Sequence, residues 1–107
     1  MTNGNLDFIF ENGVLYVRII DEITHQNAAA MREQIDEKIH GFSPDQVILD
    51  FSRLNFMDSS GLGLILGRYQ LLRQMKVKLV IENPNIEILR LLKIGKVHKI
   101  IKIVNTH

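Results

Sequence analysis

Short runs of β-branched and aliphatic residues alternate along this chain with longer segments whose apolar residues recur at helical spacing. The extended runs cover 6–10, 14–20, 47–51, 77–81 and 100–104, and the helical segments cover 27–40, 59–74 and 84–95. The expected order is therefore β-β-α-β-α-β-α-β. Strands that alternate with helices predict an α/β fold, here a mixed, largely parallel sheet of about five strands with helices packed on it.

Turn-forming residues set the expected boundaries of these elements. Asn12 and Gly13 between the first two strands are typical of a hairpin turn. Gly41 is expected to end the first helix. Asn83 is expected to cap the third helix, with Pro84 in its first turn. No linker or low-complexity stretch interrupts the pattern.

The chain is long enough for one domain with its own core. For 107 residues, surface scaling predicts about 6,100 Å² of folded surface against about 17,800 Å² for the unfolded chain. The absence of cysteine excludes a disulfide framework and a thiolate metal site. No apolar run is long enough to cross a membrane and the first residues do not resemble a signal peptide, so we expect a cytoplasmic protein.

The formal net charge of +1 conceals two halves of opposite sign. Residues 1–66 hold ten acidic side chains and four Lys or Arg, whereas residues 67–107 hold nine Lys or Arg and two Glu. Such asymmetry is found in nucleic-acid-binding domains, but it also arises from two differently charged faces of one domain. The basic residues are interleaved with apolar ones, which favours the second interpretation.

The stretch from Asn55 to Gly63 lies where a buried strand leads into a helix, a common place for functional loops in α/β proteins. Asp58 is well suited to cap the helix by accepting hydrogen bonds from its first amides. Ser59 and Ser60 then fall in the first turn, next to the positive end of the helix dipole. An ordinary helix start and a regulated serine both fit these residues.

Three glycines in the same helix, Gly61, Gly63 and Gly67, are unusual for a purely structural helix. Each costs about 1 kcal/mol relative to alanine in a helix interior. Gly63 and Gly67 are four residues apart and share a face with Ser59. That smooth face would let another surface approach closely, either the sheet of this chain or a partner.

The same stretch does not match the common catalytic motifs. A nucleophile elbow needs glycine two residues before the serine, where Met57 precedes Ser59. The Gly-Lys-Ser/Thr of a phosphate-binding loop is absent, and a dinucleotide fingerprint needs glycine where Leu66 stands. The histidines lack the spacing of metal ligands and are interpreted as surface residues; they are His25, His40, His98 and His107. We therefore expect no catalytic residue, no metal and no cofactor.

The segment from Phe56 to Tyr69 reads Phe-Met-Asp-Ser-Ser-Gly-Leu-Gly-Leu-Ile-Leu-Gly-Arg-Tyr. It closely resembles the central motif of bacterial anti-sigma-factor antagonists, which are single STAS domains. Within that family it is most similar to the antagonists of the sporulation anti-sigma F factor. The order of strands and helices agrees over about residues 5–104, so the resemblance implies that the whole chain, 1–107, is one STAS domain.

The resemblance implies a regulatory binding module and not an enzyme. Such a protein, when unphosphorylated, binds an anti-sigma factor that is also a serine kinase and thereby frees the sigma factor. The kinase phosphorylates the first serine after the aspartate of the motif, which is Ser59 here, and so inactivates the antagonist. A metal-dependent serine phosphatase restores it. The free protein is expected to be a monomer that binds neither nucleic acid nor membrane.

We expect a partner to contact the residues around Ser59, together with one residue of the loop before the first helix. These are Thr24, Asp58, Ser59, Ser60, Gly61, Leu62, Gly63 and Arg68. Asp58 would in addition cap the helix and orient the serine for the kinase. Leu62 has the alternative role of a core residue, and Arg68 that of a solvated side chain.

The chain departs from the family in two places. Asp21-Glu22-Ile23-Thr24 stands where the family often has Gly-Glu-Leu-Asp, so the glycine and the second acid are missing. Asp21 and Glu22 are interpreted as solvated turn residues. The chain also ends at His107, where relatives often carry a further helix, so one helical layer is expected to be thinner.

Three alternative functions follow from the same residues. The domain could serve a stress-response partner switch or a sensory complex in place of sporulation. An enzyme could use Ser59 as a nucleophile, but no histidine or lysine base stands at a recognised spacing from it. The basic half could bind nucleic acid, which salt-dependent binding to DNA would reveal.

Overall fold

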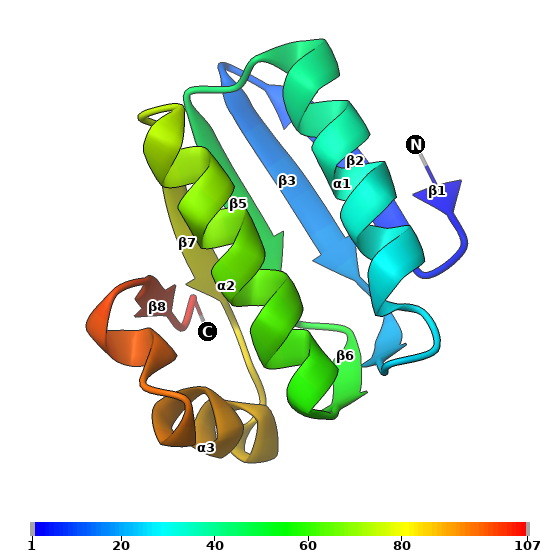
Figure 1. Ribbon diagram of the computed structural model, residues 1–107, viewed down its shortest axis with the longest axis vertical. Helices are drawn as coiled ribbons and strands as arrows, with labels where there is room; N and C mark the ends of the chain where they lie inside the picture. Colours follow the sequence, from blue (N-terminus) through cyan, green and yellow to red (C-terminus); the bar gives the residue numbers. More distant parts are fainter. Residues whose placement is uncertain (1, 107) are drawn as a thin grey trace.

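One sheet runs through the molecule, with α1 and α2 lying side by side across one of its faces (Figure 1). The computed structural model describes residues 2–106, and within them the sheet has six strands in the order β1-β2-β3-β5-β7-β8. The strands are β1 (Thr2–Asn3), β2 (Leu6–Glu11), β3 (Val14–Ile19), β5 (Gln46–Asp50), β7 (Lys78–Glu82) and β8 (Lys102–Val104). The pairs β1–β2 and β2–β3 are antiparallel and the others are parallel. The predicted mixed, largely parallel sheet is confirmed, with the two-residue β1 as an addition.

The helices follow the predicted segments closely. They are α1 (Ala28–Phe42), α2 (Ser59–Gln74), α3 (Ile86–Ile94) and the short 3-10 helix η1 (Val97–Lys99). The range 59–74 for α2 is the one expected from sequence. None of the helices in residues 2–106 is long and apolar enough to span a membrane.

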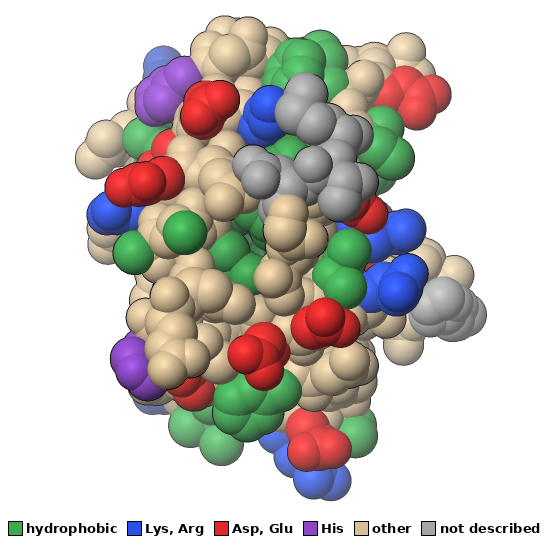
Figure 2. Space-filling view, turned by 90° about the vertical axis from the view of Figure 1, so that its right-hand side faces the viewer, with side chains coloured by type: hydrophobic (Ala, Val, Ile, Leu, Met, Phe, Trp, Pro, Cys, Tyr) green, Lys and Arg blue, Asp and Glu red, His purple; other side chains and the backbone are tan. Residues whose placement is uncertain are grey.

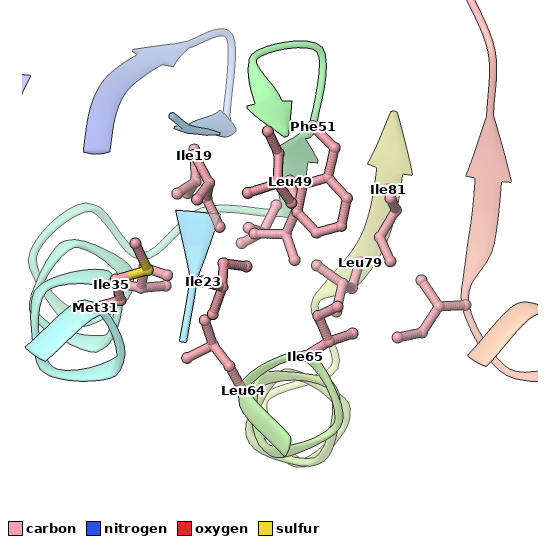
Figure 3. Packing of buried hydrophobic residues seen from close by; sticks show 14 of the residues in the cluster. Ile19, Ile23, Met31, Ile35, Leu49, Phe51, Leu64, Ile65, Leu79 and Ile81 are labelled. Atoms are coloured by element: carbon pink, nitrogen blue, oxygen red, sulfur yellow. The ribbon is translucent and has the colours of Figure 1, made fainter. Parts of the chain in front are cut away.

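The core lies between the sheet and the two helices on its face. Side chains of the central strands point toward α1 and α2, as Ile19, Leu49 and Ile81 do in Figure 3. Met31 and Ile35 of α1 and Leu64 and Ile65 of α2 close the layer from the other side (Figure 3). Alternate strand residues face away from this core. On that opposite face Arg18 and Asp50 form an ion pair of 2.9 Å.

Two helix boundaries differ from the prediction. Asn85 caps α3 in place of Asn83, because its side chain accepts a hydrogen bond from the Ile88 amide at 2.8 Å. Helix α1 continues through Gly41 and ends at Phe42. Its C-cap is Ser43, which takes the left-handed conformation (φ 48°) and donates its amide to the carbonyl of Ile39. The hairpin turn at Asn12 and Gly13 is confirmed, with positive φ at both residues.

A second, two-stranded sheet was not expected from sequence. It pairs β4 (Asp21–Ile23) with β6 (Leu54–Met57) in parallel. The interpretation of Asp21 and Glu22 as turn residues was therefore wrong, although both side chains are exposed. These strands are too short to show a periodicity, and their pairing joins segments far apart in the chain. The pair matters because β4 leads into α1 and β6 leads into α2.

The glycines of α2 occupy two different environments. A Cβ atom on Gly61 would collide with the buried side chain of Met57. A Cβ atom on Gly63 or Gly67 would meet no atom within 4 Å. Gly61 therefore permits close packing of α2 on β6, whereas packing within this chain does not explain the other two.

We expect Gly67→Ala and Gly61→Ala to shift stability in opposite directions. Gly67→Ala should raise the free energy of unfolding by about 0.5–1 kcal/mol, since alanine restricts the unfolded chain and favours helix. Gly61→Ala should lower it by about 1–3 kcal/mol, because the added methyl group overpacks against Met57. Urea unfolding of both variants measures the difference, and equal gains at the two positions would refute this account of the glycines.

Candidate functional site

Two chain segments meet at the end of the β4–β6 pair. The amide of Asp58 donates to the carbonyl of Ile23 at 3.1 Å and so continues the pairing past the strands. One oxygen of the Asp58 carboxylate, Oδ2, accepts from the amide of His25 at 3.2 Å. The loop that enters α1 is thereby held against the residue that begins α2.

Asp58 is also the N-cap of α2, as the sequence predicts. Its other oxygen, Oδ1, accepts from the amide of Ser60 at 2.8 Å. Desolvation raises the pKa of this carboxyl group, but hydrogen bonds from the amides of Ser60 and His25 outweigh it, and the pKa lies below its usual value. Asp58 is thus ionised at neutral pH and holds two segments with its two oxygens.

Ser59 is the first residue of α2 and is exposed. Ser60 follows it, partly buried, with its amide committed to Asp58. Of the two serines, Ser59 is the more accessible to another protein. Its place at the positive end of the helix suits a side chain that gains negative charge.

A shallow groove of about 380 Å³ extends from this end along α1 and α2. Its lining residues are Ala28, Ala29, Arg32, Gly63, Leu64, Gly67 and Arg68. The glycine face predicted from sequence therefore faces this open groove and not the sheet. That α1 forms the other wall of this groove was not predicted from the sequence. The run of small residues from Ala28 to Ala30 was the feature that could have indicated it.

Among the residues that the structure describes, Arg68 is the one charged residue that is buried, with 8% of its surface exposed. Its Nε lies 2.8 Å from Oδ1 of Asp36 on α1. Burial lowers the pKa of Arg68 and the Asp36 carboxylate opposes that shift, so the guanidinium stays charged. The interpretation of Arg68 as a solvated side chain was wrong, because this ion pair joins α1 to α2 at the edge of the groove. A direct contact with a partner stays a prediction.

The other predicted contact residues differ in accessibility. Gly61 is buried against Met57, so its position serves packing. Leu62 is partly buried and packs toward Gly95, so part of its side chain serves the core. Thr24 is partly buried in the loop before α1, where its hydroxyl accepts from the Gln26 amide at 3.3 Å. Asp58 holds the next residue of that loop, His25, through its amide, and a partner contact at Thr24 stays a prediction.

Acidic side chains lie along one side of the molecule. On the side of the molecule that carries α1 and β1, Asp and Glu side chains are distributed from one end to the other (Figure 2). At the N-cap of α2, Nδ1 of His25 lies 3.9 Å from Oδ2 of Asp58.

Within residues 2–106, no three His, Asp or Glu side chains are arranged to hold a metal ion.

Comparison with known proteins identifies the fold family. The family model for the STAS domain matches residues 5–107. The chain belongs to the STAS domain family. An anti-sigma F factor antagonist from Paenibacillus polymyxa is 37% identical to this STAS domain over 101 residues, which cover 94% of the chain and 86% of the relative. Another, from Lysinibacillus sphaericus, is 32% identical over 64% of the chain and 59% of that relative.

Solved structures share the fold of this STAS domain. The anti-sigma factor antagonist SpoIIAA in its unphosphorylated form has a TM-score of 0.83 at 23% identity, over 95% of this chain and 88% of that one. The phosphorylated form of SpoIIAA from Bacillus has a TM-score of 0.75 at 23% identity, over 95% of this chain and 91% of that one. A putative anti-sigma factor antagonist from Thermotoga maritima has a TM-score of 0.86 at 19% identity, over 94% of this chain and 86% of that one.

Asp21 stands at the position where the resemblance described above implies glycine. Asp21 takes a positive φ of 71°, a conformation that favours glycine. Its amide donates to the carbonyl of Arg53 at 3.0 Å, and the β4–β6 register shifts at this residue. Aspartate tolerates the left-handed region better than most residues, which fits the conformation of Asp21 at the start of β4.

We expect Asp58→Ala to lower the melting temperature of this STAS domain by several degrees, because two backbone amides lose their acceptor. Asp58→Asn keeps one side-chain oxygen as an acceptor, so its melting temperature should fall less than that of Asp58→Ala. A carboxyl group with a lowered pKa stabilises the fold above its unfolded pKa, and this contribution disappears as pH falls through the folded pKa. The stability advantage of the parent over Asp58→Asn should therefore be constant above about pH 4 and shrink as the pH falls below it. Thermal melts from pH 3 to 7 measure this advantage, and one that did not shrink between pH 4 and pH 3 would contradict the role of the ionised carboxylate.

Proposed function

We propose that this protein is an anti-sigma-factor antagonist controlled by phosphorylation of Ser59. Unphosphorylated, it binds an anti-sigma factor that is also a serine kinase and releases the sigma factor. Phosphorylation ends the binding, and a metal-dependent serine phosphatase restores it. The observation that carries the proposal is the exposed Ser59 at the start of α2, beside the open groove that contains Gly63 and Gly67.

The position of Ser59 suggests that a phosphate would leave the domain folded. It would add about −1.5 to −2 charges at the start of α2. The helix dipole favours negative charge there by about 0.3–1 kcal/mol. Asp58 repels the phosphate, but Ser59 is exposed and solvent screens the repulsion. The switch would then act on partner binding and not on folding.

The groove explains how a small modification could prevent binding. A partner packed over Gly63 and Gly67 would lie directly beside Ser59, because these residues share one face of α2. Phosphate on Ser59 would have to be buried or would collide with the partner. A loss of about 3–4 kcal/mol would weaken binding by roughly two to three orders of magnitude.

A binding role accounts for the site better than catalysis does. A serine nucleophile needs a base within hydrogen-bonding distance. The nearby His25 is exposed, and its ring lies by the carboxylate of Asp58 and not by a serine nucleophile that it could activate.

We also propose that this regulator is cytoplasmic and is a monomer when it is free. The names of the relatives favour the anti-sigma F factor as partner over a stress-response or sensory complex.

Incubation with the cognate anti-sigma kinase and ATP should place one phosphate on Ser59, located by mass spectrometry. Ser59→Ala should bind the kinase and stay unmodified, whereas Ser59→Asp should bind at least about tenfold more weakly, since it adds charge at the interface. Ser60→Ala is the matched control and should still be phosphorylated. Parental affinity in Ser59→Asp, or a large loss of thermal stability on phosphorylation, would contradict the interface mechanism.

Gly63→Met should weaken kinase binding by about tenfold or more, because the side chain would fill the groove that the partner needs. Stability should not fall, since a Cβ atom at this position meets no other atom within 4 Å. Gln74→Met is the control, because it places the same side chain at an exposed position of α2 about 16 Å further along the helix. Calorimetric titration gives both affinities, and equal affinities would exclude the groove as the docking surface.

A further inference from the structure

A second concave surface lies at the opposite end of α2 from Ser59. It is a pocket of about 470 Å³ between the last turns of α2, the start of β7 and the segment that enters β8. Figure 1 shows that end of α2 and β8 along the same edge of the molecule. Helix α2 has 16 residues and is therefore about 24 Å long. The pocket is thus separate from the Ser59 site.

Four cationic side chains line this pocket, from three different segments. Arg73 and Lys76 come from the end of α2 and the turn after it, Lys78 from β7 and Lys102 from β8. All four are exposed, and none forms an ion pair with a described residue. No acidic side chain is among the residues that line the pocket. Four of the nine Lys and Arg residues in 67–107 therefore line this one pocket.

The helix dipole explains only half of this cluster. Arg73 and Lys76 lie near the free carbonyl groups at the end of α2, where cations are favourable. Lys78 and Lys102 stand on strands and have no such partner. Like charges gathered around one hollow repel each other, so a bound anion would stabilise the arrangement. The Ser59 mechanism uses none of these four residues.

The rest of the lining is apolar and is open at the sheet edge. Tyr69, Val77, Leu79 and Ile100 complete the pocket, and Ile100 is 48% exposed. Strand β8 pairs with β7 only from Val80 onward, so the edge beside Lys78 and Leu79 is not covered by a strand. Like the groove beside Ser59, the pocket is shallow and open to solvent. The lining suits a ligand with an apolar part and several negative charges.

We propose that this pocket binds a ligand carrying phosphate groups, either a free phosphate ester or a lipid headgroup. A phosphate group offers several acceptor oxygens and Lys and Arg both bind it well, so one group can bridge cations from different segments. The acidic surface of a protein partner fits less well, because lysine is depleted in protein interfaces. Nucleic acid also fits less well, since the pocket offers no fully exposed aromatic ring for a base to stack on.

Two probes distinguish the sources of the phosphate. Titration of the isotope-labelled protein with inorganic pyrophosphate should shift the amide resonances of residues 73–79 and 100–102 and leave those of residues 58–63 unchanged. Sedimentation with phosphatidylglycerol vesicles, compared with phosphatidylcholine vesicles, tests the headgroup. Binding to either probe through the pocket supports the proposal, and the vesicle experiment tells whether a lipid is the source.

Charge reversal ties the binding to the pocket. Lys78→Glu with Lys102→Glu should weaken binding of the effective probe by about tenfold or more, since two charge-assisted contacts become repulsive. The control is Arg90→Glu with Lys93→Glu, two exposed residues of α3 outside the pocket, which changes the net charge equally. Circular dichroism confirms that each variant is folded. Kinase binding at Ser59 should be the same in all, so this proposal and the proposed function fail independently.

Three results would overturn the assignment. The first is that neither pyrophosphate nor phosphatidylglycerol vesicles bind. The second is equal weakening by the pocket variant and by the α3 control, which would indicate attraction to overall charge. The third is tighter binding of poly-glutamate than of both phosphate probes, which would indicate an acidic protein partner.

Discussion

The carboxylate of Asp58 is the interaction on which the candidate site depends. One oxygen caps α2 at Ser60 and the other holds the loop before α1 through the amide of His25. The backbone of the same residue continues the β4–β6 pairing by donating to Ile23. Because these bonds fix both helix entrances together, Ser59 and the mouth of the groove keep one relative position. A partner thus meets a preformed surface, which reduces the entropic cost of binding.

The groove shows a conflict between stability and recognition. Alanine at Gly63 or Gly67 would favour the helix and collide with nothing, yet both positions are glycine. The ion pair between Arg68 and Asp36 joins the two helices at this groove. The groove is therefore open to solvent while its two walls are held together. An open, glycine-lined surface that costs stability is expected where another molecule must approach closely.

Local patterns in the sequence predicted most of the fold. The range of α2, the cap at Asp58 and the hairpin at Asn12 and Gly13 follow from helical period, capping chemistry and turn preference, which act over a few residues. The pairing of β4 with β6 was missed, because three- and four-residue strands have no readable period. Arg68 was misjudged for a similar reason, since its partner Asp36 lies on another helix.

The sequence by itself therefore determined the order of the three long helices and of the strands of the main sheet from β2 onward, the family resemblance and the serine at the start of α2. Only the tertiary structure decided that the Gly63 and Gly67 face opens on α1, that Asp58 joins two loops, and that four cations from three segments share one pocket. The reason is physical. Propensity and periodicity are properties of neighbouring residues, whereas a groove, an ion pair or a pocket exists only when distant segments pack together.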